Sequence, residues 1–194
     1  IKPKPFHPQN VPEAIQPWQV KDPAQIPRIR FVYGDTYAAG YLTVTFAAPK
    51  TGKSLLALAE AIDAASGRGI LTKMEAAPMR VLYFNAEDDQ DLLDARTVAA
   101  LEENCIPQSE IEGRLFVVSG VAAERQLILI RGEQAELNEA AFTFLTETVK
   151  RENIALAIFD PLQDLSHSPE TNEVFRALGA RIRRMASETG VAIG

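Results

Sequence analysis

The chain has 194 residues and a mass of 21.3 kDa, and 46% of them are hydrophobic, which suffices for a packed core and excludes disorder of the whole chain. Twenty basic residues stand against 26 acidic ones, so the net charge of −6 excludes a wholly basic protein that coats nucleic acid. A single cysteine and two histidines exclude an intramolecular disulfide and a structural zinc site.

Residues 1–30 are expected to form an extended arm. Seven of the twelve prolines lie between Pro3 and Pro27, a density that prevents a regular helix or a central strand. Five basic residues against two acidic ones give the arm a charge of +3 and leave −9 for the rest. Packing on its own core or a neighbouring subunit is one role for the arm, and binding nucleic acid is the other. We expect Trp18, the only tryptophan, to anchor it.

From about Tyr41, short apolar runs alternate with segments of helical period, a pattern typical of strand–helix repeats on a largely parallel sheet. The expected strands are 42–46, 81–85, 115–118, 154–159 and 191–193, with an additional strand at 126–130. The expected helices are 53–65, a second helix through 101 that Asp88 or Asp89 caps, 136–152 and 172–187. The fold class is therefore α/β, with a mostly parallel twisted sheet, helices on both faces and the proline-rich arm.

Two of these helices have apolar stripes that we expect to face the sheet. The first stripe comprises Leu55, Leu58, Ala59 and Ile62, and Gly67 supplies a stop. The second comprises Leu137, Ala141, Phe144, Leu145 and Val149.

The domain division expected from these patterns is an arm at 1–30 and an α/β core at 31–194. The last strand runs to the final residue, Gly194. Catalytic groups in parallel sheets lie just past the carboxyl ends of strands, so we expect the core to be truncated at this end.

A phosphate-binding loop is the sharpest motif. Residues 47–54, Ala-Ala-Pro-Lys-Thr-Gly-Lys-Ser, match G-x-x-x-x-G-K-[ST] except at Ala47, where the pattern has glycine. Such a loop points backbone N–H groups at a polyphosphate, and the next helix directs its positive end at the same oxygens. The alternative is an ordinary strand-to-helix turn with an exposed lysine. We expect ATP and Mg²⁺ as cofactors, with ATP bound by Ala48, Pro49, Lys50, Thr51, Gly52, Lys53, Ser54 and Leu55.

Within this loop, Lys53 is expected to reach the β- and γ-phosphates, and the Ser54 hydroxyl to ligate Mg²⁺. A second magnesium-holding group is predicted at Asp160, which comes after six apolar residues at the end of a strand. A plain loop aspartate after a core strand is the alternative.

Hydrolysis also needs a group that orients water or accepts its proton. Pro161 comes directly after Asp160, so this group must come from elsewhere. Glu87 lies just past the end of a different strand, where an open parallel sheet faces its ligand. We predict Glu87 as the catalytic base; the alternative is that residues 87–89 only cap the next helix.

Four segments carry a resemblance to a known family: 48–54, 65–68 (Ala-Ser-Gly-Arg), 81–88 with Arg96 downstream, and 158–162. On these residues the chain resembles the RecA-like P-loop ATPases over about 31–194, and most of all the RepA-type branch of plasmid- and phage-associated hexameric replicative helicases. The resemblance implies that Glu87 is the catalytic base and that ATP lies between subunits of a hexameric ring. We expect Arg96 to contact phosphate or the neighbouring subunit; the alternative is an ordinary exposed arginine on a helix.

The chain departs from that family in four respects. Ala95 stands where the family commonly has the first of two arginines, and Ala47 where it has glycine. The histidine-rich segment and the arginine finger that would come after 191–193 are absent. We therefore expect these 194 residues to bind nucleotide better than they hydrolyse it.

Three functions are compatible with these motifs. The first is a Mg-ATP-hydrolysing, ring-forming replication motor that acts on single-stranded DNA; its DNA contacts would be local, because the sequence pI is about 5.1. The arginines that could contribute to them, or instead form a solvated or subunit-facing surface, are Arg176, Arg181, Arg183 and Arg184. The second is a nucleotide-dependent regulatory or assembly protein that does not translocate, and the third a small-molecule kinase.

The setting expected from the sequence is the cytoplasm. No apolar run approaches the roughly 20 residues of a membrane span, and the first residues lack the apolar core of a signal peptide. We therefore expect no membrane partner, and the resemblance to the RepA-type ATPases implies a homo-oligomer.

Overall fold

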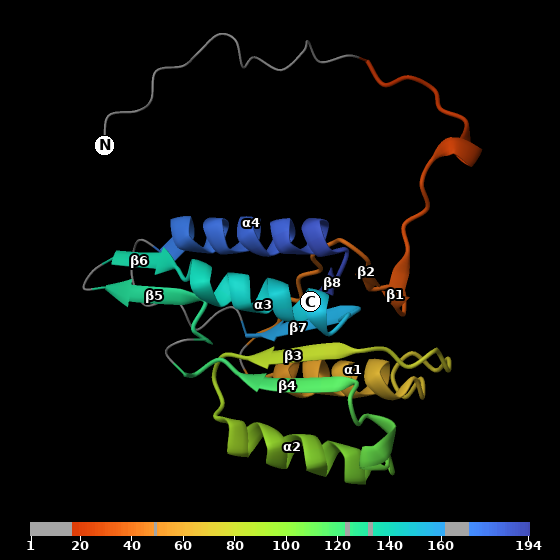
Figure 1. The fold of residues 1–194 in the computed structure, drawn as a ribbon. Coiled ribbons are helices and arrows are strands. Elements are labelled where there is room, and N and C mark those ends of the chain that lie inside the picture. The colour runs from red at the N-terminus through yellow and green to blue at the C-terminus, as the bar shows by residue number, and fades with distance from the viewer. Residues whose placement is uncertain (1–16, 49, 123–124, 132–133, 162–170) are drawn as a thin grey trace.

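A four-stranded parallel sheet lies at the centre of the molecule (Figure 1). The computed structural model describes residues 17–48, 50–122, 125–131, 134–161 and 171–194. The strand order is β4-β3-β7-β8. The bounds are β3 Val81–Asn85, β4 Leu115–Ser119, β7 Leu156–Asp160 and β8 Ala192–Ile193. This architecture confirms the α/β fold class with a mostly parallel sheet.

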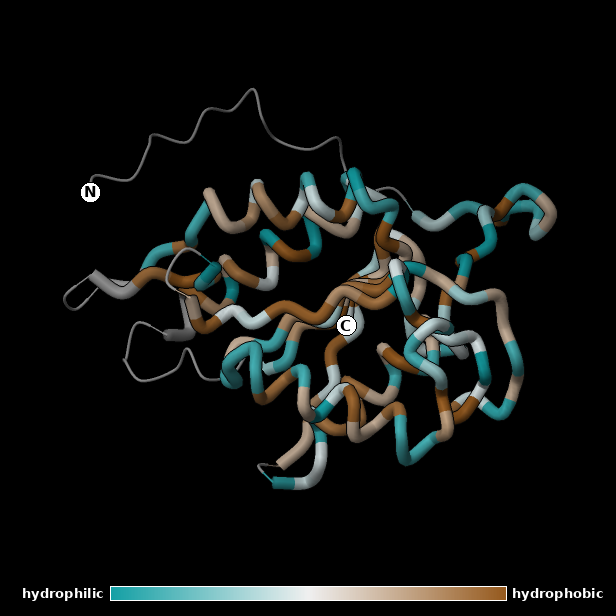
Figure 2. Tube along the Cα trace, turned by 60° about the horizontal axis from the view of Figure 1, so that its bottom comes forward, coloured by the Kyte–Doolittle hydropathy of each residue, from teal (hydrophilic) through white to brown (hydrophobic). Residues whose placement is uncertain are grey.

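Helices cover both faces of this sheet (Figure 1). One face carries α1 Lys53–Ser66 and α2 Gln90–Glu103, and the other carries α3 Glu139–Arg151 and α4 Thr171–Thr189. Every residue of β3 and β7 is buried, which explains why these strands read as continuous apolar runs. Figure 2 shows the apolar strands running through the middle of the molecule.

Alternate residues of the central strands fill two separate cores. Val81 and Tyr83 pack with α1 and α2, whereas Leu82 and Phe84 pack with α3 and α4. The register pairs Asn85 of β3 with Ser119 of β4 on one side and with Asp160 of β7 on the other. The carboxyl ends of three strands therefore meet at one edge of the sheet.

The end of α1 and the start of α2 agree with the expectations from the sequence. The α1 helix stops at Gly67, whose φ of 73° is a left-handed conformation that suits glycine. A Cβ at Gly67 would also lie 2.3 Å from the carbonyl oxygen of Ala76. Asp89 caps α2, because its carboxylate accepts a hydrogen bond of 2.8 Å from the Leu92 N–H.

The predicted apolar stripes were partly wrong. Leu55 is 68% exposed, because the buried face of α1 is centred on small residues such as Ala57, Ala61 and Ala65 and leaves Leu55 at its edge. Close packing of alanines lets the helix approach the sheet. Leu58 and Ile62 are buried as expected.

A β-hairpin replaces the start of the predicted helix 136–152. Its strands are β5 Ile128–Arg131, where the additional strand was expected, and β6 Gln134–Leu137, which the sequence did not indicate. The α3 helix begins only at Glu139, after Asn138 caps it by accepting from the Ala141 N–H. Leu137 therefore belongs to a strand.

On α3, Ala141, Leu145 and Val149 are buried as predicted. Phe144 is 52% exposed, and Phe142 takes its place in the core. The helical turn of 3.6 residues puts Phe142 on the face of Ala141 and Leu145, and turns Phe144 away from it.

The strand predicted at 42–46 is reduced to a single parallel bridge between Leu42 and Ile193. The Thr43 N–H donates to the Ile193 carbonyl at 2.8 Å, and the Ile193 N–H donates to the Tyr41 carbonyl at 3.0 Å. The next residue, Gly194, forms backbone hydrogen bonds with Ala157 and Phe159 of β7. Residues 44–46 consequently have no strand neighbour among the described residues.

The described part of the arm, residues 17–30, is exposed and contains only the 3₁₀ turn Pro23–Gln25. Trp18 is 76% exposed, so it does not anchor the arm to the described part of the core. Next come two short antiparallel strands, β1 Phe31–Tyr33 and β2 Tyr37–Ala38. Another 3₁₀ turn spans Gln108–Glu110. Within the described residues, no helix has the length and apolar character needed to cross a membrane.

Candidate nucleotide site at the carboxyl edge of the sheet

Asp160 ends β7 at the carboxyl edge of the sheet and is only 3% exposed. Its Oδ2 accepts a hydrogen bond from the Tyr83 hydroxyl at 2.9 Å and a longer one from Asn85 Nδ2 at 3.4 Å. Burial, and then the charge of Asp160, raise the pKa of the Tyr83 phenol far above its ordinary value. Tyr83 therefore stays protonated and remains a donor to the carboxylate.

Glu87 lies two residues beyond the end of β3 and is exposed. The side chain of Asn85 holds the backbone here, because its Oδ1 accepts from the Glu87 N–H at 2.9 Å and the Asp88 N–H at 2.7 Å. The Ala86 N–H donates to the Asp160 carbonyl at 2.8 Å. Glu87 and Asp160 are thus brought to the same edge by neighbouring strands.

Arg96 lies on α2 and forms an ion pair with Asp88. The Ser119 hydroxyl donates to the Asp88 carbonyl at 2.7 Å, so the segment after β3 is tied to β4 as well. Arg96 thus has an intramolecular partner, which the sequence had not indicated. Asp89 is the N-cap of α2, as one of the two candidates from the sequence.

The phosphate loop, residues 47–54, leads into the N-terminus of α1. Gly52 has a φ of 87° and Lys50 a φ of 64°, so the chain turns twice through left-handed conformations. The Thr51 hydroxyl donates to the Ala48 carbonyl at 2.7 Å. Ala47 is not among the residues with positive φ, so alanine costs no strain where the pattern has glycine. Pro49 lies outside the described residues.

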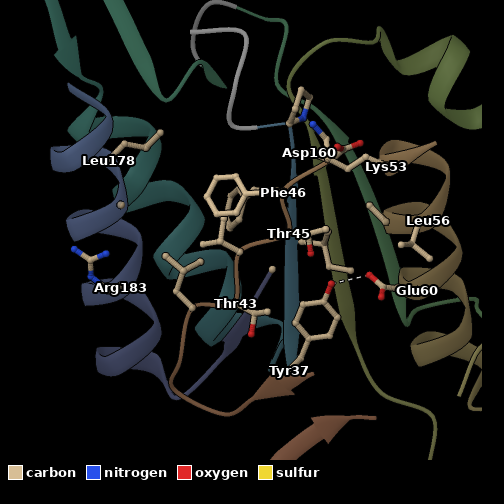
Figure 3. Close-up of a pocket in the computed structure, with 18 of the residues that line it drawn as sticks. Tyr37, Thr43, Thr45, Phe46, Lys53, Leu56, Glu60, Asp160, Leu178 and Arg183 are labelled. Carbon is tan, nitrogen blue, oxygen red and sulfur yellow. Dashed lines mark hydrogen bonds between the residues drawn. The ribbon is translucent and has the colours of Figure 1, made fainter. Parts of the chain in front are cut away.

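A cavity of about 460 Å³ lies between residues 42–46, β7, α1 and α4 (Figure 3). Most of its lining is apolar. Lys53 and Asp160 lie at the same end of it, whereas Ser54 and Glu87 are not part of its lining. The charged and phenolic residues that line it are Tyr37, Lys53, Glu60, Asp160 and Arg183.

Glu60 makes a hydrogen bond across this cavity, accepting from the Tyr37 hydroxyl at 2.6 Å. Burial raises the pKa of Glu60 above its ordinary value, and the bond from Tyr37 partly opposes that rise. The folded protein therefore binds a proton at Glu60 more tightly than the unfolded chain does. Stability from this group is present below the unfolded pKa and is lost as pH rises through the folded pKa.

We expect Glu60→Gln to stabilise the protein increasingly as pH rises from about 4 to 7, because glutamine keeps the acceptor for Tyr37 and removes the desolvated charge. The measurement is the melting temperature of variant and wild type across this range. Glu112→Gln, at an exposed carboxylate, is the control. A melting-temperature difference for Glu60→Gln that does not change with pH would contradict the expectation.

Comparison with known proteins identifies the family of the chain. Residues 9–193 match the model of a family described as an AAA domain, a family of P-loop ATPases. The chain belongs to this family. No curated protein matches it.

Membership of the AAA-domain family agrees with the phosphate loop and supports nucleotide binding and ATPase activity in general. Such ATPases typically bind nucleotide with Mg²⁺. Hydroxyl and carboxylate oxygens are ligands that Mg²⁺ prefers, and Ser54 and Asp160 offer one of each. Both hydrogen bonds that the Asp160 carboxylate accepts from the described residues go to Oδ2. Its Oδ1 can therefore face a metal ion, and the side chains of Ser54 and Asp160 fit Mg²⁺.

The sequence analysis did not predict two residues at this edge of the sheet as part of the site. Asn85 and Tyr83 lie inside a largely apolar run, Val-Leu-Tyr-Phe-Asn, and its interpretation as a buried strand left only the residues beyond Asn85 as candidates for the site. The signal was present, because a polar side chain at the end of a strand with both faces buried needs hydrogen-bond partners.

Proposed function

We propose that the protein binds ATP with Mg²⁺ at the phosphate loop and hydrolyses it, as a RepA-like replication ATPase that acts as a motor on single-stranded DNA. One observation carries the hydrolytic part. The pairing of β3 with β7 sets Asn85 beside Asp160, so the backbone leading to Glu87 starts next to that carboxylate. Lys53 lines the same cavity as Asp160.

In this mechanism Lys53 binds the β- and γ-phosphate oxygens, and the N-terminus of α1 adds its positive end. Ser54 and Asp160 would hold Mg²⁺, which neutralises charge that develops on the transferred phosphoryl group. Glu87 orients the attacking water and accepts its proton. The new bond joins the water oxygen to the γ-phosphorus, the bond to the bridging oxygen breaks, and ADP and phosphate leave.

A cytoplasmic homo-oligomer, with a hexameric ring as its form, is part of this proposal and rests on the resemblance to RepA-type ATPases. The division into an arm at 1–30 and a core at 31–194 belongs to it as well. A ring would let a few basic residues in its pore contact DNA although the whole chain carries −6. Arg96 would then contact phosphate or a neighbouring subunit after leaving Asp88.

Two of the four arginines of α4 favour a second candidate. Arg181 donates to Glu139 at 3.1 Å and lies over the Phe142 ring, with 5.0 Å from its guanidinium carbon to the ring centroid. Arg184 pairs with Glu188. Arginines engaged within the chain contribute less to phosphate binding, which supports a nucleotide-dependent regulatory or assembly protein that uses the same site without translocation.

The deciding experiment titrates the protein with a non-hydrolysable ATP analogue, with Mg²⁺ and with EDTA, and then measures ATPase activity with and without single-stranded DNA. Tight binding that requires Mg²⁺, together with DNA-stimulated turnover and strand separation, is the expected result for the motor. Slow turnover that DNA does not stimulate would favour the regulatory or assembly protein. No association with the analogue would contradict both.

A further inference from the structure

Asn85 occupies the centre of the carboxyl edge of the sheet and is completely buried. Its backbone is fixed on both sides, since it is paired with Ser119 and with Asp160, and its carbonyl accepts from the Gly120 N–H at 2.7 Å. A side chain on such a backbone has little freedom to move. Hydrogen bonds at both ends of its amide then hold the orientation of the side chain.

The two ends of this amide face two different parts of the candidate site. The Oδ1 end accepts from the Glu87 and Asp88 N–H groups at 2.9 and 2.7 Å. The Nδ2 end lies 3.3 Å from the Tyr83 hydroxyl and 3.4 Å from Oδ2 of Asp160. One side chain thus joins the main chain at the predicted base to the carboxylate predicted to hold the metal.

We propose that Asn85 is a positioning residue that sets Glu87 and Asp160 relative to each other, and that Tyr83 supports only the Asp160 half of this arrangement. The inference deepens the proposed function and rests on it. Acceptance of two successive N–H groups fixes the turn that presents Glu87. Donation to Oδ2 by Asn85 and Tyr83 leaves Oδ1 of Asp160 as the oxygen that can face the metal.

The two halves can be separated by substitution. Asn85→Ala removes both the acceptor for Glu87 and a donor to Asp160. Tyr83→Phe removes the hydroxyl that donates to Asp160 and accepts from Asn85 Nδ2, and it leaves the acceptor for Glu87 in place. Partners of a metal ligand commonly change metal affinity or activity by about 10- to 100-fold when they are removed. A misplaced base lowers turnover rather than ground-state binding of the nucleotide.

For Asn85→Ala we expect kcat to fall about 10- to 100-fold, with little change in the KM for ATP. We also expect a higher Mg²⁺ concentration at half-saturation for binding of a non-hydrolysable ATP analogue. Tyr83→Phe should raise that Mg²⁺ requirement and lower kcat less than Asn85→Ala does, because Asn85 still accepts from the Glu87 and Asp88 N–H groups. Hydrogen exchange of the Glu87 and Asp88 amides should accelerate in Asn85→Ala and not in Tyr83→Phe.

Asn138→Ala is the matched control, because Asn138 is also a buried asparagine whose Oδ1 accepts a helix N–H and whose Nδ2 donates to a carbonyl, at the start of α3. Equal losses in this control would overturn the inference, since they would reflect general destabilisation. Wild-type kcat and Mg²⁺ dependence in a folded Asn85→Ala protein would overturn it too.

If Asn85→Ala does not fold, Tyr83→Phe decides, and an unchanged Mg²⁺ requirement then refutes the inference. The proposed function fails separately. In that case the wild-type protein itself would show no Mg²⁺-dependent binding of the analogue, before any variant is compared.

Discussion

Glu87→Gln is expected to abolish most ATP turnover while leaving ATP bound. Glutamine has nearly the same shape as glutamate but cannot accept a proton from the attacking water, and general-base catalysis typically contributes about 10²- to 10⁴-fold to a rate. We expect kcat to fall by this order. Binding should persist, because Glu87 lies outside the cavity lined by Lys53 and Asp160.

The measurement pairs steady-state phosphate release with equilibrium titration of ATP. Glu103→Gln serves as the control, since Glu103 is an exposed carboxylate at the other end of α2. Turnover by Glu87→Gln at the wild-type rate would remove the base assignment from Glu87. Loss of ATP binding in the same variant would indicate instead that Glu87 supports the structure of the site.

Strands with both faces buried were the parts of the fold that the sequence revealed best. The runs at 81–85 and 154–159 contain almost only apolar residues, because helices cover both sides of the sheet. The residues expected at helix ends were predicted equally well. Gly67 ends α1 through its left-handed conformation, and Asp89 begins α2 through its side chain.

Elements that depend on a distant partner could not be predicted with the same success. The residues at 42–46 have the composition of a strand, but pairing needs a neighbour, and only Ile193 supplies one among the described residues. The second strand of the hairpin β5–β6 ends in a segment that also has helical spacing, so periodicity alone does not distinguish the two structures. The strand forms because it pairs with β5. Periodicity indicates which secondary structure a segment prefers, whereas strand pairing depends on residues in another part of the chain.

In the candidate site, too, features of the local sequence were predicted and contacts with distant residues were not. Glu87 and Asp160 were predicted from a rule about strand ends, and the structure adds that their strands are direct neighbours. The sequence could not reveal that Tyr83 and Asn85 would hydrogen-bond Asp160, since these contacts cross between strands far apart in the chain. The pairing of Arg96 with Asp88 was hidden as well, because either residue alone reads as an exposed charge on or beside a helix.

Lys53→Ala is expected to have the other large effect, a loss of nucleotide affinity together with turnover. The ammonium is the only lysine charge in the lining of the cavity at Asp160, among the residues the structure describes. Removal of a hydrogen-bonding charge that neutralises phosphate commonly costs about 2 to 3 kcal/mol or more, which corresponds to at least about 30-fold in affinity. Calorimetric titration of the Mg²⁺ complex of a non-hydrolysable ATP analogue measures this change.

Lys150→Ala, at an exposed lysine in the last turn of α3, tests whether the loss of any positive charge has the same effect. Its affinity should equal that of wild type, because long-range attraction between exposed charges is screened beyond about 8 to 10 Å at ordinary salt. If Lys53→Ala bound the analogue as tightly as Lys150→Ala, the phosphate loop would be an ordinary strand-to-helix turn. Neither Glu87 nor Asp160 would then have a triphosphate on which to act.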